Sequence, residues 1–270
     1  MSARTDTFRQ LHESGTFVIP NPWDVGSAHL LEGLGFKALA TTSAGLAWTL
    51  GRQDNAATLE DHVAHLTAIC AAVDLPVNAD FEHGFAAEPE SVAANVARAV
   101  ATGVAGLSIE DSTGDPAKPL FDFELAVERI RAARAAIDRS ATGVLLTGRS
   151  EGFIVGRPDL AETIRRLVAY AEAGAECLYA PGLRKPEDIR AVVEAVAPLP
   201  VNALVGTNFT TVNQLAALGV RRISVGGALA RVAWTGFLDA AREIRERGTF
   251  EGLGRAIPFP ELEARFEPPS

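Results

Sequence analysis

Charged side chains follow three short apolar runs of the sequence at the points where the runs end. Asp80 and Glu82 follow the first run, Glu110 and Asp111 the second, and Arg149 the third. Ionised groups are rare beside buried strands unless they are paired or bind a ligand. Carboxylate oxygens suit Mg²⁺ or Mn²⁺ better than zinc, and arginine suits carboxylate ligands. The pattern therefore predicts a site for a divalent cation and an anionic ligand.

Each of these groups also has a plain structural interpretation. Asp80 and Glu82 alone are equally compatible with a turn pair that caps a helix or forms salt bridges. Arg149 can pair with Glu151 or Glu110 instead of binding a substrate carboxylate. The functional interpretation is favoured because three neighbouring strands contribute, and a cation relieves the repulsion among clustered carboxylates.

Other polar segments carry weaker signals. Residues 43–45, Ser-Ala-Gly, form either a bare turn or a hydroxyl and N–H cradle for an anion. His62 and His65 have the spacing of a metal-binding pair, but their position within a helix predicts a solvated face. His83 beside Glu82 is a candidate proton carrier near neutral pH.

Bulk composition excludes several classes of function. The 270 residues carry a net charge of -9, which argues against nucleic-acid binding because phosphates need a basic surface. No apolar run reaches the roughly 18 residues of a membrane span, and the first residues lack a signal-peptide core. Cys70 and Cys177 lie in apolar segments, which predicts reduced, buried thiols. We expect a cytoplasmic protein.

The order of the apolar runs predicts the fold. Strands are expected at residues 17–19, 38–41, 77–79, 106–109, 144–147, 177–180, 201–204 and 222–225. Helical periodicity lies between them, and a glycine precedes several strands. Eight βα units favour a single-domain (β/α)8 TIM-type barrel over residues 1–270. An open doubly wound sheet is the alternative. Residues 257–270 are expected to be a C-terminal tail with a short helix at 261–266.

Motifs along the chain carry a resemblance to a known family. They include Asn-Pro-Trp-Asp at 21–24, Gly-Arg-Gln-Asp at 51–54, Asp-Phe-Glu-His-Gly at 80–84 and Ile-Glu-Asp at 109–111. With these motifs in order, the chain resembles the isocitrate lyase/phosphoenolpyruvate mutase superfamily. The resemblance implies a (β/α)8 barrel, Mg²⁺ or Mn²⁺, and small 2-oxo acid substrates. It also implies a homodimer or homotetramer whose subunits exchange a C-terminal helix.

The resemblance assigns a cation-binding set and a catalytic set. Asp80 corresponds to the direct metal ligand, which also contacts the substrate, while Glu82 and Glu110 hold metal-bound waters. Asp54 lies near the metal. By the same resemblance we expect Asp54, Glu110 and Arg149 to take part in catalysis.

The resemblance also assigns a cradle for the substrate. Ser43, with the backbone of Ala44 and Gly45, corresponds to the group that takes the carboxylate and oxo oxygens. Arg149 assists, and Asn202 is a further polar contact.

Departures from the family pattern narrow the activity. Isocitrate and methylisocitrate lyases carry a Lys-[Lys/Arg]-Cys-Gly-His loop after the Ile-Glu-Asp motif, whereas residues 112–119 contain neither cysteine nor histidine. Pro181 stands where lyases have a glutamate and mutases a histidine. Glu82 replaces the commoner aspartate but keeps a carboxylate. Two usual acid–base accessories are therefore missing, while the metal site and the 2-oxo acid cradle remain.

The sequence thus favours a Mg²⁺- or Mn²⁺-dependent carbon–carbon lyase or decarboxylase. The expected substrate is a small 2-oxo or 2-hydroxy di- or tricarboxylate, such as oxaloacetate or an isocitrate-like acid, cleaved through a metal-stabilised enolate. The site is also expected to recognise 2-oxoglutarate or pyruvate. The alternatives are carbon–phosphorus chemistry, as in a phosphoenolpyruvate mutase or phosphonopyruvate hydrolase, and a non-catalytic 2-oxo acid binding protein.

Overall fold

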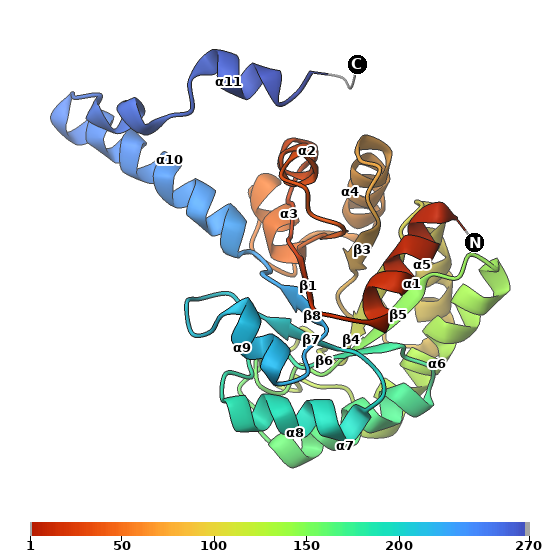
Figure 1. Cartoon of the computed structure of the whole chain (residues 1–270). Helices are drawn as coiled ribbons and strands as arrows, with labels where there is room; N and C mark the ends of the chain where they lie inside the picture. Colours follow the sequence, from red (N-terminus) through yellow and green to blue (C-terminus); the bar gives the residue numbers. More distant parts are fainter. Residues whose placement is uncertain (1, 268–270) are drawn as a thin grey trace.

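The computed structural model describes residues 2–267, so residues 268–270 of the expected tail lie outside the description. Eight parallel strands pair in the order β1-β8-β7-β6-β5-β4-β3-β2 (Figure 1). The strands are β1 (Phe17–Ile19), β2 (Leu39–Ala40), β3 (Val77–Asp80), β4 (Gly106–Glu110), β5 (Leu145–Arg149), β6 (Cys177–Tyr179), β7 (Val201–Leu204) and β8 (Arg222–Ser224). A backbone hydrogen bond of 3.0 Å from the Ala40 N–H to the Pro20 carbonyl links β1 to β2. The predicted (β/α)8 barrel is confirmed, and the open sheet is excluded.

Helices alternate with the strands and cover the outside of the barrel. They are α2 (Val25–Gly33), α3 (Ser43–Thr49), α4 (Leu59–Ala72), α5 (Pro89–Ala101), α6 (Phe123–Ser140), α7 (Leu160–Glu172), α8 (Pro186–Val196) and α9 (Val212–Ala217). Capping boxes at Asp24 and Thr58 satisfy free N–H groups where α2 and α4 begin. The apolar stripe of α5, with Val92 and Val96 fully buried, shows how these helices hold to the sheet.

The first helix, α1 (Ala3–Glu13), packs against the barrel at the end opposite the strand carboxyl termini. Phe8 of α1 forms a buried cluster with Ile19, Leu145 and Cys177. Both cysteines, Cys70 and Cys177, are free and buried, as predicted. Among residues 2–267, no helix has the length and apolar character needed to cross a membrane.

One layer of side chains inside the barrel is polar, above the apolar cluster that contains Phe8. Asn78, Thr147 and Asn202, on the alternate strands β3, β5 and β7, are almost completely buried. Arg222 of β8 contacts all three. Alternate strands contribute side chains to one layer of such a barrel, and branched apolar residues usually dominate these layers. A polar layer instead leaves room and chemistry for a site inside the barrel.

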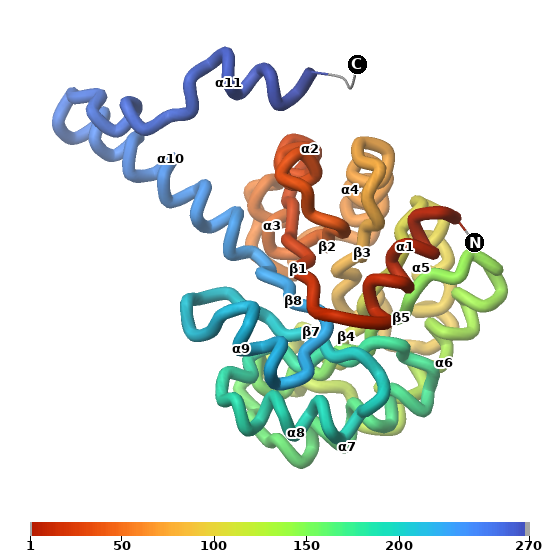
Figure 2. The backbone as a smooth tube through the Cα atoms, viewed as in Figure 1, coloured from red at the N-terminus to blue at the C-terminus, as the bar shows by residue number. Residues whose placement is uncertain are grey.

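The C-terminal segment leaves the barrel as an extended arm (Figures 1 and 2). It consists of α10 (Ala228–Arg247), the 3₁₀ helix η1 (Glu251–Arg255) and α11 (Phe259–Ala264), so the expected last helix begins two residues early. Large apolar side chains on the arm are exposed, among them Val232, Phe237, Phe250 and Phe259. Such a surface fits the expected exchange of this segment between subunits, which stays a prediction.

Candidate active site

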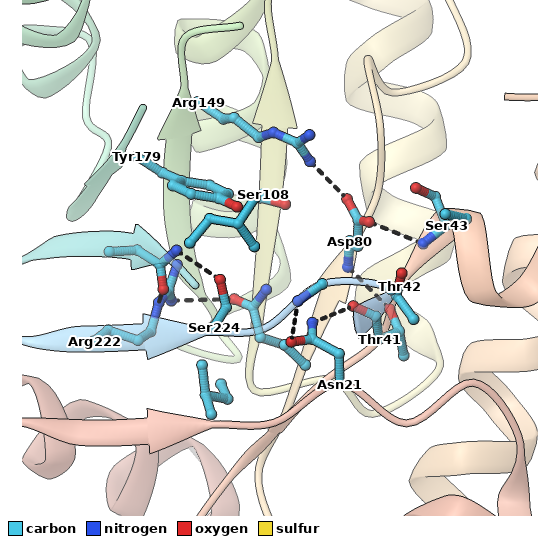
Figure 3. A pocket seen from close by; sticks show the side chains of 18 of the residues that line it. Asn21, Thr41, Thr42, Ser43, Asp80, Ser108, Arg149, Tyr179, Arg222 and Ser224 are labelled. Atoms are coloured by element: carbon cyan, nitrogen blue, oxygen red, sulfur yellow. Dashed lines mark hydrogen bonds and ion pairs between the residues drawn. The ribbon is translucent and has the colours of Figure 1, made fainter. Parts of the chain in front are cut away.

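A cavity of about 190 Å³ opens at the carboxyl ends of the strands, where (β/α)8 barrels hold their active sites (Figure 3). Six of the predicted site residues line it. Those that line it are Ser43, Ala44, Asp54, Asp80, Arg149 and Asn202, while Glu110 contacts Arg149 from behind. The remaining lining residues are Ile19, Asn21, Ala40, Thr41, Thr42, Asn78, Ser108, Tyr179, Leu204, Arg222, Ser224, Gly226 and Gly227.

Asp80, the last residue of β3, is fixed on both of its carboxylate oxygens. Its Oδ2 accepts a 2.9 Å hydrogen bond from the Ser43 N–H, and its Oδ1 lies 3.0 Å from Arg149 Nη1. Its own N–H donates to the Thr41 hydroxyl at 3.0 Å. These contacts, drawn in Figure 3, hold the carboxylate at the cavity wall in one orientation.

Arg149 lies among three carboxylates. Its Nη1 is 3.0 Å from both Asp80 and Glu110, and its Nε donates to Glu151. Burial raises the pKa of Glu110 well above its ordinary value and also raises the pKa of Glu151, although Arg149 opposes both shifts. Burial opposes the charge on Arg149, but Glu110, Glu151 and Asp80 outweigh it and raise the pKa of Arg149. One guanidinium faces three carboxyl groups, so an added cation would be favourable here.

Glu82 does not reach the cavity, although it follows Asp80 by two residues. Its φ of +44° lies in the left-handed region, which turns the backbone as the chain leaves β3. The buried carboxylate lies 3.2 Å from Nε2 of His62 on α4, and both side chains are 2% exposed. The predicted solvated face for His62 is therefore wrong, because His62 shares the buried face of α4 with Leu66 and Ile69.

Asp111 has a structural role beside the site. Its carboxylate accepts hydrogen bonds from the Tyr170 hydroxyl and the Glu151 N–H, both at 2.7 Å, and it lies 3.2 Å from Arg166. These contacts hold the segment that follows Arg149 in place. Asp111 does not line the cavity.

The segment from Thr42 to Gly45 forms the opposite wall. Ser43 and Ala44 line the cavity, but Gly45 lies behind them. A Cβ atom at Gly45 would lie 2.6 Å from Thr42 Cγ2 and 2.7 Å from Trp23 Cβ, so the glycine permits close packing of this turn. Asp54 lies at the exposed mouth, where partial burial and then the charge of Asp80 raise its pKa.

Sequence reasoning missed several polar residues of the cavity. Asn21 Oδ1 accepts from the N–H groups of Val225 and Gly226, both at 2.8 Å, which fixes the loop after β8. Arg222 and Ser224 alternate along β8 and so face the same side. The spacing of two residues within an expected strand could have placed both side chains on the cavity side. Asn202 does line the cavity, but its amide binds Arg222 and Ser224.

The residues of the cavity fit a divalent cation that takes most of its ligands from water and substrate. Among residues 2–267, no three His, Cys, Asp or Glu side chains together form a site that would enclose a metal ion. Mg²⁺, however, usually keeps several waters and takes only one or two carboxylates plus substrate oxygens. Asp80 and Asp54 both face the cavity and supply that number.

The segment that replaces the cysteine loop offers no acid–base group to the cavity. It forms a small turn in which Ser112 pairs with Leu120. Lys118 points away and pairs with Asp122 at 2.7 Å on the exposed surface. Neither Lys118 nor Pro181 lines the cavity.

Comparison with known proteins agrees with the fold and the site. The profile of the family described as phosphoenolpyruvate phosphomutase matches residues 8–245. An uncharacterized protein of Mycobacterium tuberculosis is 33% identical over 262 residues, which is 96% of this chain and 95% of the relative. An oxaloacetate decarboxylase of Pseudomonas aeruginosa is 30% identical over 278 residues, covering 96% and 90%.

Solved structures show the same architecture. A Burkholderia cenocepacia J2315 protein described as a lyase/mutase aligns with a TM-score of 0.95 and 45% identity, over 98% of this chain and 96% of that one. Oxaloacetate acetylhydrolase, in complex with its product oxalate, aligns at 0.86 with 27% identity, over 97% and 93%. Phosphonopyruvate hydrolase, in complex with oxalate and Mg²⁺, aligns at 0.86 with 25% identity, over 97% and 95%.

Fold and site together define a (β/α)8-barrel enzyme with a carboxylate-rich site at the strand ends. The chain belongs to the phosphoenolpyruvate phosphomutase family, within the isocitrate lyase/phosphoenolpyruvate mutase superfamily of lyases and mutases.

Proposed function

We propose that the protein is a Mg²⁺- or Mn²⁺-dependent carbon–carbon lyase or decarboxylase for a small 2-oxo dicarboxylate such as oxaloacetate. The observation that carries this proposal is the pairing of Asp80 with Arg149 and the Ser43 N–H at the wall of a small cavity. No cysteine or histidine is among the residues that line this cavity, so the chemistry must need little acid–base help. Decarboxylation of a 2-oxo dicarboxylate meets that condition.

Each side chain then has a defined part. When bound, the cation withdraws electrons from the 2-oxo oxygen and so lowers the barrier to enolate formation. Asp80 and Asp54, which both line the cavity, would hold the cation. Arg149 would donate to a carboxylate or enolate oxygen, because its guanidinium already lies at the cavity surface. The hydroxyls of Ser108 and Tyr179 are available to orient the substrate.

The relatives support a small 2-oxo acid as substrate. They include oxaloacetate decarboxylase, and two of the solved structures contain oxalate, a small dicarboxylate. Carbon–phosphorus chemistry is the less favoured alternative, because the oxaloacetate decarboxylase matches nearly the whole chain.

Assembly and location form part of the same proposal. We infer one domain over residues 1–270 that works in the cytoplasm as a homodimer or homotetramer. The arm from α10 onward, with residues 257–270 as its tail, would be exchanged between subunits. Its exposed apolar side chains support this arrangement.

The test is an NMR turnover screen with Mg²⁺ or Mn²⁺. Oxaloacetate, isocitrate, methylisocitrate and phosphonopyruvate are each incubated with wild type, Asp80→Ala and the surface control Asp122→Ala. Samples with metal but no protein correct for spontaneous loss of oxaloacetate. We expect wild type and Asp122→Ala to consume one carboxylic acid and Asp80→Ala to be inactive.

Three other outcomes would change the conclusion. Turnover of phosphonopyruvate alone would assign carbon–phosphorus chemistry. Metal-dependent binding of 2-oxo acids without any turnover would favour a non-catalytic binding protein. Equal turnover by Asp80→Ala and wild type would contradict the site itself.

A further inference from the structure

Arg222 is a buried arginine without an acidic partner. Its side chain extends from β8 into the barrel, is 3% exposed as a residue and lines the cavity. Its Nε donates to Asn202 Oδ1 at 2.9 Å, and Nη2 donates to the Thr147 hydroxyl at 3.0 Å. Its Nη1 lies 3.5 Å from Asn78 Oδ1. All three of these partners are neutral.

The fourth partner, His12, is also neutral. Its Nδ1 lies 2.7 Å from the Phe8 carbonyl and must donate there, which leaves Nε2 to accept from Arg222 at 3.4 Å. Burial, followed by the charge of Arg222, lowers the pKa of His12 to about 3. Among the described residues, no carboxylate therefore lies within ion-pair distance of Arg222.

Two other buried arginines are paired with carboxylates, and a third does not reach the cavity. Arg149 contacts three carboxylates, and Arg166 pairs with Asp111. Arg129 is held by the backbone carbonyls of residues 83, 86 and 110, and it does not line the cavity. Arg222 alone combines an uncompensated charge with access to the cavity.

An unpaired buried charge is costly, and linking strands does not require one. Neutral amides and hydroxyls could join β3, β5, β7 and β8 at lower cost. A guanidinium on the cavity wall is explained if an anion enters the cavity and supplies the missing negative charge. Figure 3 shows Arg222 and Asp80 on different sides of the pocket, so the anion would lie between the cation site and Arg222.

We propose that Arg222 is a specificity-determining residue whose charge selects dianionic over monoanionic ligands at this site. The proposal rests on the proposed function, in which a small 2-oxo acid binds here. Arg222 acts on the second negative charge of a dicarboxylate across the cavity, while the cation and Arg149 act on the 2-oxo acid end. A monoanion such as pyruvate gains less from Arg222, because its one charge lies at the cation.

The test separates the charge of Arg222 from its hydrogen bonds. Calorimetry with Mn²⁺ present measures the affinities of 2-oxoglutarate, a dianion whose second carboxylate lies away from its 2-oxo acid end, and pyruvate, a monoanion, for wild type, Arg222→Gln and Arg222→Lys. Lysine keeps the charge but loses the planar fork, and glutamine keeps hydrogen bonding but loses the charge. Thr147→Val, which breaks one hydrogen bond of the same network, is the matched control.

We expect Arg222→Gln to lower the ratio of 2-oxoglutarate to pyruvate affinity by about tenfold, the scale of a unit charge acting across a partly buried site. Arg222→Lys and Thr147→Val should keep the ratio near that of wild type. Equal ratios in the Gln and Lys variants would overturn the proposal, because hydrogen bonding alone would then explain Arg222.

Two further results have defined meanings. If wild type binds neither ligand, the proposed function fails and this proposal fails with it; if wild type binds both, only the variants decide. Should Arg222→Gln not fold, Asn78→Asp supplies a carboxylate beside Arg222 and keeps its hydrogen-bond acceptor. In that case an unchanged ratio of 2-oxoglutarate to pyruvate affinity in Asn78→Asp would overturn the proposal.

Discussion

Replacing His12 by glutamine should make the stability of the protein less sensitive to acid. His12 packs edge-on against Phe8 and Phe17, with ring centroids 4.6 Å and 5.1 Å away, and accepts a hydrogen bond from Arg222. Glutamine preserves an acceptor for Arg222 but cannot titrate. The substitution therefore removes a proton-binding group from the barrel interior while it keeps the polar contact.

The direction and size of the effect follow from linkage. The pKa of His12 is lowered from 6.5 to about 3 by burial and then by Arg222. Below pH 6.5 His12 binds a proton in the unfolded chain but stays neutral in the native state, so the native state loses stability as pH falls. Each pH unit contributes about 1.4 kcal/mol, which gives about 2 kcal/mol between pH 7.5 and pH 5.0. The full shift would give about 5 kcal/mol near pH 3.

The assay is urea unfolding of wild type and His12→Gln at pH 7.5 and pH 5.0. His65 and His83, whose pKa values burial lowers to about 4, make wild type more acid-sensitive still, but both proteins contain them. The free-energy difference between the two proteins therefore isolates His12. We expect the destabilisation caused by His12→Gln to be about 2 kcal/mol smaller at pH 5.0.

A second variant tests whether the pH effect depends on the hydrogen bond from Arg222. His12→Leu lacks any acceptor for Arg222 and should be less stable than His12→Gln at both pH values, yet show the same pH contrast. If the destabilisation is the same at pH 7.5 and pH 5.0 in both variants, His12 binds its proton equally in the native and unfolded states. The neutral environment inferred around Arg222 would then be refuted.

Two further predictions concern binding and assembly. Arg149→Ala should weaken oxalate binding in the presence of Mn²⁺ by about 1.5–3 kcal/mol, the value of a hydrogen bond to a charged group; an unaltered calorimetric affinity would contradict its role. Removing residues 257–270 should lower the oligomeric state, because α11 and its exposed apolar side chains would be lost from the arm. A native-mass spectrum identical to that of the full chain would exclude the tail from assembly.

The fold was predictable because its signals are local and repeated. Buried parallel strands are near-continuous apolar runs, and glycines that precede strands have positive φ angles, as Gly103, Gly174 and Gly219 do. The long helix α10 was not predicted, because its exposed apolar side chains do not follow the pattern of a helix packed on its own barrel.

The site was predictable where strand geometry alone decides it. Asp80, Glu110 and Arg149 end adjacent strands, and parallel pairing of β3, β4 and β5 brings them together. Glu82 was expected near Asp80 because the resemblance assigns it to metal-bound water. The strand ends at Asp80, however, and the positive φ of Glu82 turns its side chain toward His62. That turn depends on tertiary contacts with α4.

The two arginines of the cavity show opposite electrostatic arrangements, and this contrast bears on the reaction. Arg149 faces more carboxylates than it can neutralise, whereas Arg222 faces none. A cation would therefore be drawn to the Asp80 side of the cavity, and the second charge of a dianionic substrate toward Arg222. Cleavage of a 2-oxo dicarboxylate moves negative charge onto the 2-oxo oxygen, at the end where the cation would lie. The charge asymmetry of the cavity would thus favour both binding of the dianion and the electron shift that breaks its carbon–carbon bond.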